Sequence, residues 1–266
     1  MLTAHSMGKC LAQMVVAGVI TFGGATLALA QPIECETVLG PGGKFKLEAD
    51  LVCPTLDINP GITVDSATLD LNGHTVDCVV GEDGGIGILL IGRGAKLQNG
   101  TVQNCERNVQ VAGDGSAVTN VNTFGADDSI GIDSDNNKLT GNTVTSTDNG
   151  TGIIVGGNKN KLSNNTIIDS AFLGFEVRGN DNTLVGNTAD GSVFDGFFVT
   201  GTGNTLKNNT ALNNLDQGII VLGTGNTIKN NTALNNGTDI RDDNGNCDFN
   251  TYKKNTFETS DPACIE

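Results

Sequence analysis

The 266-residue chain carries 30 acidic side chains against 15 basic ones, which gives a formal net charge of −15 at pH 7. A surface this acidic repels a phosphate backbone, so nucleic acid is excluded as a partner. The chain has no Trp and one Tyr, and any aromatic platform for a ligand has to come from its 10 phenylalanines.

The first 30 residues have the pattern of a cleavable secretory signal. Lys9 precedes an apolar run over residues 11–29, which ends in the small-residue pattern Ala28-Leu29-Ala30. Gln13 interrupts the run, and together with its glycines this argues against a membrane span. We therefore expect a secreted, extracellular protein whose mature chain covers residues 31–266.

The cysteines predict a disulfide framework. The chain has seven, and six remain once the signal segment with Cys10 is removed. An even number of cysteines in a secreted chain favours disulfides, although several pairings of the six are open. Their positions suggest that they staple the first and last coils through the pairs Cys35–Cys53, Cys78–Cys105 and Cys247–Cys264.

A unit of about 22 residues repeats along most of the chain, most clearly after Gly174, Gly196 and Gly218. Such a period is typical of a solenoid. Within each unit apolar and polar residues alternate between Gly and Asn, which indicates short strands joined by tight turns. The prediction is an all-β, single-domain right-handed parallel β-helix with three short strands per coil. One apolar column of its core should contain Leu97, Val118, Leu139, Leu162, Leu184, Leu206, Ile228 and Tyr252.

The repeat also sets the expected domain organisation. Residues 31–66 have less of the pattern and read as an N-terminal cap with the first strands, residues 67–257 as the β-helix, and residues 258–266 as a C-terminal cap tail. Caps shield solenoid ends from edge-to-edge pairing.

Two columns of asparagine fall at the turns. Stacked amides of this kind can satisfy turn backbone and bond to one another from coil to coil, so we interpret them as structural ladders; a row of ligand-binding amides is the alternative. Six Asn-Xaa-Thr sequons are candidate glycosylation sites, and repeats rich in Asn and Thr also produce them by chance. The sequons are at Asn99, Asn149, Asn164, Asn208, Asn230 and Asn236.

The repeats of the type Asn-x-Leu-x-x-Asn-x-Ala, together with LDLNGHTV at residues 69–76, resemble the parallel β-helix proteins of the pectate-lyase-like superfamily. The resemblance covers about residues 56–257. It implies a right-handed parallel β-helix. For function it implies several classes, because this superfamily includes polysaccharide lyases, glycoside hydrolases, uronate epimerases and adhesins.

The segment GADDSIGI, residues 125–132, resembles the Asp-Asp segment of polygalacturonase-type glycosidases. The resemblance implies acid/base roles for Asp127 and Asp128, since one carboxyl protonates the leaving oxygen while another activates water. The family's histidine falls on Thr151 and its arginine on Glu176. With these partners altered, Glu176 becomes a second acid/base candidate; the alternative is that the Asp pair is an acidic turn.

Outward positions of the first strand in each coil predict a shallow groove. One column should contain Asp128, Thr151, Asp195, Gln217 and Asp239, and the next column Ile154, Glu176, Phe198 and Ile220. The catalytic candidates are then Asp127, Asp128, Glu176 and Arg178, with Arg178 stabilising charge, and the substrate-binding candidates are Asp195, Phe198, Ile154 and Ile220. Alternatively, Glu176 and Arg178 are a simple surface ion pair.

No metal site is expected, because one of the two histidines, His5, lies in the signal segment, and the remaining His74 and oxidised cysteines form no set of soft ligands. Ca²⁺ is the one candidate cofactor, since pectate-lyase-like enzymes use it to neutralise a uronate. An outward column of Lys207, Lys229 and Lys253 reads either as a basic stripe for an anionic polysaccharide or as a solvated face.

Together these features predict a secreted β-helix protein that binds or modifies an extracellular carbohydrate, by lyase, hydrolase or epimerase-like acid/base chemistry. A non-catalytic matrix, wall or adhesion scaffold is the competing class, favoured by the regularity of the last coils. A lyase, cyclase or isomerase acting on a small hydrophobic molecule is the third, because the groove is largely apolar. The sequence gives no indication of the oligomeric state.

Overall fold

The computed structural model describes residues 19–22, 25–28, 32–54, 59–78, 85–145, 147–244, 247 and 249–265. The chain forms two compact units, Met1–Ile33 and Glu34–Glu266. In the first, strand β1 (Val19–Phe22) pairs antiparallel with β2 (Ala25–Ala28). The rest of the predicted signal segment lies outside the described residues, and its cleavage remains a prediction.

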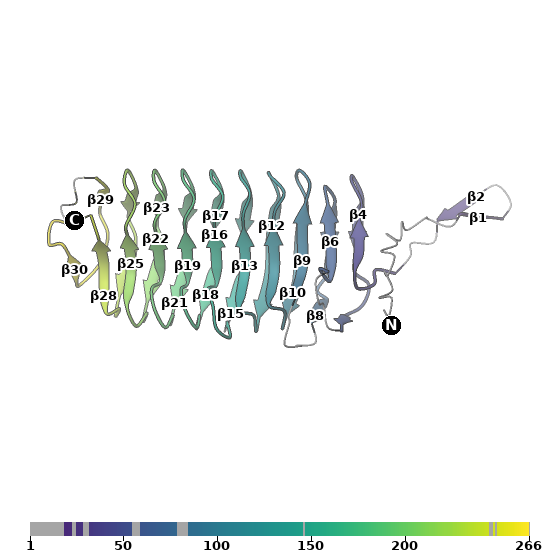
Figure 1. The fold of residues 1–266 in the computed structure, drawn as a ribbon, viewed down its shortest axis with the longest axis horizontal. Coiled ribbons are helices and arrows are strands. Elements are labelled where there is room, and N and C mark those ends of the chain that lie inside the picture. Colours follow the sequence, from purple (N-terminus) through teal and green to yellow (C-terminus); the bar gives the residue numbers. More distant parts are fainter. Residues whose placement is uncertain are drawn as a thin grey trace, which may run out of the picture. The chain divides into compact units, whose positions relative to one another are not determined.

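The second unit is a parallel β-helix, in which successive coils stack in sequence order (Figure 1). Each regular coil contributes one strand to each of three sheets. Sheet 1 has 11 strands, all parallel to their neighbours. They are β3 (Thr37–Leu39), β6 (Ile62–Asp65), β9 (Ile86–Ile91), β11 (Arg107–Val111), β13 (Asp128–Ile132), β16 (Ile153–Val155), β19 (Phe175–Val177), β22 (Phe197–Val199), β25 (Gln217–Val221), β28 (Thr238–Asp242) and β30 (Ser260–Asp261).

Sheets 2 and 3 are joined, because two long strands bend from one sheet into the other. These are β10 (Lys96–Gln103) and β12 (Ala117–Phe124). Sheet 2 also contains β4 (Lys44–Lys46), β7 (Thr68–Asp70), β14 (Lys138–Thr140), β17 (Lys161–Ser163), β20 (Thr183–Val185), β23 (Thr205–Lys207), β26 (Thr227–Lys229) and β29 (Thr251–Lys253). Sheet 3 also contains β5 (Leu51–Cys53), β8 (Thr75–Cys78), β15 (Thr143–Thr145), β18 (Thr166–Ile168), β21 (Thr188–Asp190), β24 (Thr210–Leu212) and β27 (Thr232–Leu234).

The core consists of stacked apolar columns, as the sequence predicted. In sheet 2, Leu139, Leu162 and Leu184 pair in register and are fully buried. In sheet 1, the rings of Phe175 and Phe197 stack with centroids 4.7 Å apart. Each inward residue therefore packs on its equivalents one coil away, which is how a thin solenoid buries apolar surface without a central layer. Tyr252, expected to continue the sheet 2 column, is only half-buried in the last full coil.

The two asparagine columns form hydrogen-bonded ladders. Between sheets 2 and 3, Asn142 Nδ2 donates to Asn165 Oδ1 at 2.9 Å, and Asn165 Nδ2 donates to Asn187 Oδ1 at 2.9 Å. The same Nδ2 atom of Asn165 also donates to the Leu139 carbonyl, at 3.2 Å. Buried turn backbone is thereby satisfied, since such groups are costly without a partner. The column from Asn137 to Asn250 forms a second ladder through backbone N–H donors.

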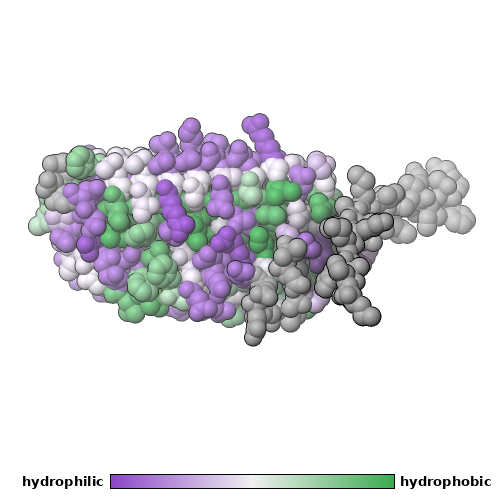
Figure 2. Space-filling view, viewed as in Figure 1, coloured by the Kyte–Doolittle hydropathy of each residue, from purple (hydrophilic) through white to green (hydrophobic). Residues whose placement is uncertain are grey.

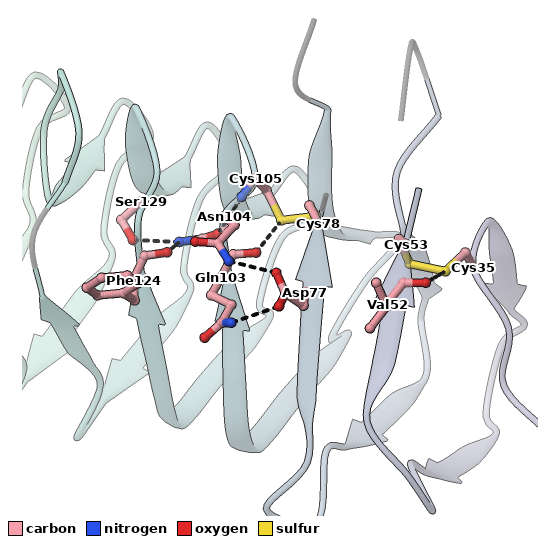
Figure 3. Close-up of a disulfide and its surroundings, with 11 residues drawn as sticks. Cys35, Val52, Cys53, Asp77, Cys78, Gln103, Asn104, Cys105, Phe124 and Ser129 are labelled. Carbon is pink, nitrogen blue, oxygen red and sulfur yellow. Dashed lines mark hydrogen bonds between the residues drawn. A yellow bond between two sulfur atoms is a disulfide. The ribbon is translucent and has the colours of Figure 1, made fainter. Parts of the chain in front are cut away.

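Three disulfides are present, in the pairs suggested by the sequence: Cys35–Cys53, Cys78–Cys105 and Cys247–Cys264. Figure 3 shows the first two, which hold the N-terminal coils together, with the polar contacts around them. Next to the Cys78–Cys105 bridge, Asp77 accepts hydrogen bonds from Gln103 and Asn104 one coil away, at 2.9 and 2.7 Å (Figure 3). Covalent and polar links therefore reinforce the coils where fewer neighbours stack.

Candidate functional site

The outward residues of sheet 1 form the candidate site, and we call this surface the sheet 1 face. Its central column runs through Ile154, Glu176, Phe198 and Ile220, which pair in register on β16, β19, β22 and β25. This is the column that the sequence predicted. Ile154, Glu176 and Ile220 are buried although they lie at outward positions of their strands.

Glu176 and Arg178 form a bidentate ion pair on this face. Arg178 Nε donates to Glu176 Oε1 at 2.6 Å and Arg178 Nη2 donates to Oε2 at 2.9 Å. The hydrogen bonds to Glu176 raise the pKa of the Arg178 guanidinium, and the negative charges of Asp128 and Asp133 raise it further. Positive charge is thus fixed at the middle of the sheet 1 face.

Asp195 lies at the edge of the sheet 1 face, in the turn that leads into β22. It is 6% exposed, and its Oδ1 accepts a 2.8 Å hydrogen bond from the backbone N–H of Gln217. Burial raises the pKa of Asp195 to about 6, and the neighbouring charge of Asp216 also raises it, whereas the hydrogen bond lowers it. Asp195 is therefore a carboxyl that can hold or release a proton close to neutral pH.

The column that contains Asp195 also includes a residue that the sequence prediction did not name. Backbone hydrogen bonds join Gly152 to the Leu173 carbonyl and Gly174 to the Asp195 carbonyl. Buried Leu173 therefore lies on the coil between those of Thr151 and Asp195. An apolar residue consequently separates Asp195 from the N-terminal part of the face.

Asp128 belongs to a separate polar network nearer the N-terminus. Arg107 donates to Asp128 Oδ2 at 2.8 Å and to Gln110 Oε1 at 2.6 Å, and Gln110 donates to Asp133 at 3.0 Å. The network covers Gly131: a methyl group there would come within 2.7 Å of Gln110 Oε1. Asp128 therefore forms an ion pair with an arginine one coil before it, and the sequence analysis assigned no role to Gln110 or Asp133.

Asp127 does not join this network. It is exposed in the turn before β13, and its Oδ1 accepts a 3.1 Å hydrogen bond from Asn149 Nδ2 in the next coil. Asp127 and Asp128 lie two coils before Glu176, about 10 Å along the axis. The structure thus brings Glu176 and Arg178 together with Ile154 and Phe198, and it places the Asp pair at a distance.

Exposed apolar side chains border the sheet 1 face in the turns that lead from sheet 3 into sheet 1. Phe172 and Phe194 are 41% and 43% exposed and meet edge to face, with ring centroids 4.7 Å apart. Leu215, one coil further, is 72% exposed. We call Phe172, Phe194 and Leu215 the apolar ridge. In the space-filling view, apolar and polar patches alternate over the coils on the face shown (Figure 2).

The sequons differ in accessibility. Asn99, Asn149, Asn164 and Asn208 are exposed, whereas Asn230 and Asn236 are half-buried. The amide of Asn236 is part of a third ladder that the sequence analysis missed: its Oδ1 accepts a hydrogen bond from Asn214 Nδ2, and its own Nδ2 donates to Asp239 Oδ1. In the folded chain the side-chain nitrogen of Asn236, where a glycan would be attached, is thus engaged in a hydrogen bond.

Among the described residues, no three His, Cys, Asp or Glu side chains gather as metal ligands. Ca²⁺ takes roughly six to eight oxygen ligands, and on the sheet 1 face Asp128 and Glu176 are already bonded to arginines. This donor set does not fit Ca²⁺. The described residues also contain no helix that is long and apolar enough to cross a membrane.

Comparison with solved structures supports the architecture. The chain is similar to the A-module of the mannuronan C-5 epimerase AlgE6 of Azotobacter vinelandii, with a TM-score of 0.52 and 13% identity over 84% of this chain and 75% of that one. A PL6 family polysaccharide lyase from Pseudopedobacter saltans is similar with a TM-score of 0.50 and 17% identity, over 84% of this chain and 79% of the lyase. The Dettilon tailspike protein is similar with a TM-score of 0.52 and 11% identity, over 84% of this chain and 58% of the tailspike protein. At these identities the similarity concerns the fold alone.

No curated protein matches the sequence significantly. A family model, described as the right handed beta helix region, matches residues 128–266, which is more than half of the chain. The stacked parallel coils, the inward apolar columns and this match agree, and the chain belongs to the right-handed β-helix family.

Proposed function

We propose that the protein binds and modifies an extracellular carbohydrate on the sheet 1 face by acid/base chemistry. One observation carries the proposal: Asp195, a buried carboxyl with a pKa of about 6, directly follows the exposed ring of Phe194 and precedes Phe198 on the face. Aromatic rings pack against the apolar faces of sugars, and a carboxyl with this pKa can exchange a proton near neutral pH.

The neighbouring groups fit distinct roles. Asp195 would donate the proton to a leaving oxygen, or take one from a sugar carbon, depending on its state at the working pH. Glu176 would supply a fixed negative charge, and Arg178, which is 60% exposed, would attract a uronate carboxylate to the face. Asp127 and Asp128 would contact the same extended ligand two coils away, as a second pair of acid/base candidates.

The similar structures motivate the choice of substrates. Two of them are named as a mannuronan epimerase and a polysaccharide lyase. Uronate polysaccharides are therefore the first class to test, with neutral polysaccharides beside them. Secretion, which would bring the protein to such substrates, is part of the proposal.

The test is turnover of this panel by the purified protein, with added Ca²⁺ and then with a chelator. Unsaturated products would identify a lyase, new saturated reducing ends a hydrolase, and changed sugar composition without cleavage an epimerase. Asp195→Asn and Glu176→Gln should abolish activity. Asp181→Asn is the matched control, because Asp181 is exposed in a turn at φ 56°, a conformation that Asn tolerates.

A non-catalytic scaffold is the second candidate, favoured by the regular coils and by the engagement of Glu176 with Arg178. Carbohydrate binding without turnover, by protein shown to be folded, would support it over the enzyme. Binding of small apolar molecules but of no carbohydrate would contradict both and favour the apolar column of Ile154, Phe198 and Ile220 as the ligand site.

A further inference from the structure

Basic side chains are distributed unevenly over this acidic protein. The strands of sheet 2 from β10 to β29 carry six of the chain's 15 Lys and Arg residues and none of its 30 Asp and Glu residues. The sheet 1 face has no such segregation, since its arginines alternate with carboxylates. We call the six residues the lysine strip: Lys96, Lys138, Lys161, Lys207, Lys229 and Lys253.

These lysines point outward and remain available. All are exposed except Lys229, which is half-buried. Each lies at an outward position of its strand, next to a buried residue such as Leu139, Leu162 or Leu206. No ion pair among the described residues involves a lysine. The strip therefore presents positive charge that no ion pair among the described residues neutralises.

Protection of a sheet edge does not explain the strip. Lysines on edge strands discourage pairing with other chains. The strands β10, β14, β17, β23 and β26, however, are each hydrogen-bonded on both sides, so their lysines lie on the broad face of the sheet. Only Lys253, on β29, is near the end of the stack.

The strip consists of two neighbouring columns: Lys96, Lys138 and Lys161 begin their strands, whereas Lys207, Lys229 and Lys253 end theirs, two residues further along. Lys207, Lys229 and Lys253 are in register on consecutive coils, as are Lys138 and Lys161. With strands about 4.8 Å apart, the seven steps from β10 to β29 extend for about 34 Å. In β23, β26 and β29 a threonine lies two residues before each lysine, so a hydroxyl accompanies each ammonium group.

We propose that the lysine strip is a docking surface for a single extended polyanionic polysaccharide with a carboxylate on its sugars, separate from the sheet 1 face. Ammonium groups at coil spacing match charges repeated along such a chain, and threonine hydroxyls match its hydroxyl groups. A DNA duplex or a lipid bilayer is wider than the strip. Either would also meet the carboxylates of the adjoining turns, among them Asp114, Asp135 and Asp181.

The test is binding of the full chain to polygalacturonate, with dextran as a neutral polymer and with duplex DNA and phosphatidylserine vesicles as other polyanions. Binding should be confined to polygalacturonate. It should weaken as salt rises from about 0.01 to about 0.15 M, because the screening length falls from about 30 to about 8 Å. The triple variant K207Q/K229Q/K253Q should bind about tenfold more weakly than the unaltered chain.

The control K44Q/K46Q/R93Q removes the same charge from exposed positions outside the strip, at the N-terminal end of the coils. On β7, Thr68 lies between Lys44 and the strip, and Asp70 pairs with Lys46. It should bind within about twofold of the unaltered chain. Circular dichroism establishes that both variants are folded. Equal weakening of both, tighter binding to DNA or vesicles, or no binding at low salt would overturn the proposal. Because the assay measures binding alone, its result is independent of any turnover on the sheet 1 face.

Discussion

Arg178 donates two hydrogen bonds to Glu176, and the two partners differ sharply in exposure: the side chain of Arg178 is 60% exposed and that of Glu176 only 10%. The carboxylate has lost most of its water, whereas the guanidinium has kept much of its own. Loss of the ion pair should therefore destabilise the fold more when it leaves Glu176 without a partner than when it leaves Arg178 without one.

This difference predicts an asymmetric response to mutation. Arg178→Gln leaves a buried carboxylate without its cation and should lower the free energy of unfolding by about 2 kcal/mol. Glu176→Gln leaves an arginine that can turn into solvent and should cost less than about 1 kcal/mol. Urea unfolding of both variants at neutral pH measures the two losses. Equal losses would contradict this description of the pair.

Asp195 predicts a pH-dependent stability. Its pKa rises from 3.8 to about 6 on folding, so below pH 3.8 the carboxyl is protonated in both states and its burial costs least. Between pH 3.8 and about 6 the unfolded state ionises while the folded state stays protonated, so the fold loses up to about 3 kcal/mol, and this loss is complete above about pH 6. Asp195→Asn, which cannot ionise, should therefore be more stable than the unaltered chain at pH 8 and close to it at pH 3.5. Thermal melts across this range measure the crossover; a constant difference at all pH values would contradict the raised pKa.

The buried asparagine ladder predicts a large loss of stability on truncation. Asn187 is fully buried, accepts hydrogen bonds from Asn165 and donates to Asn209 and the Leu162 carbonyl. Asn187→Ala leaves several of these groups unsatisfied and should cost about 3 kcal/mol.

Asn180 provides the matched control for the ladder. It also bonds to both neighbouring coils, through Asn158 and Thr202, but it is exposed. Water can replace its bonds, so Asn180→Ala should cost less than about 1 kcal/mol. Chemical unfolding of both variants gives the comparison, and a similar cost at the two positions would show that burial is not the deciding factor.

The C-terminal disulfide predicts local fraying on its removal. Cys247 and Cys264 are separated by 17 residues, and a bridge of this span stabilises by about 3 kcal/mol through the unfolded chain. C247S/C264S should melt at a lower temperature, and its amide hydrogens should exchange faster in β28 and β29 than in β16. Uniformly faster exchange along the stack would indicate instead that the coils unfold as one unit.

The architecture could be predicted from the sequence because several independent patterns in it indicate the same fold. The period of about 22 residues, the buried leucines of sheet 2 and the stacked asparagines all point to one parallel solenoid, and the cysteines cluster where the repeat fades. Each coil independently predicts the same fold, so a few irregular turns do not change the prediction.

The arrangement of the sheet 1 face could be predicted only in part. The column of Ile154, Glu176, Phe198 and Ile220 follows from strict alternation within short strands. Leu173 lies 22 residues after Thr151 and 22 before Asp195, so the repeat also places it in their column, where the sequence prediction did not name it. The side-chain contacts could not be predicted in this way. Arg107 lies 21 residues before its partner Asp128, whereas Asp128 bonds to Thr151, 23 residues later. Such offsets decide the contacts, and they are set by turn geometry that the repeat does not encode.

The coils from Gly174 onward have a consequence for how this molecule can change its length. Since they repeat every 22 residues, deleting residues 196–217 would bring Asn231 to the position of Asn209, ready to accept the hydrogen bond of Asn187. In the shortened molecule, buried Ile219 would take the place of Phe197 next to Phe175, so an apolar residue would remain at this inward position. Its length is thus adjustable in whole coils. Removing this coil would also remove Phe198 from the sheet 1 face and Lys207 from the lysine strip, so the two surfaces change in length together.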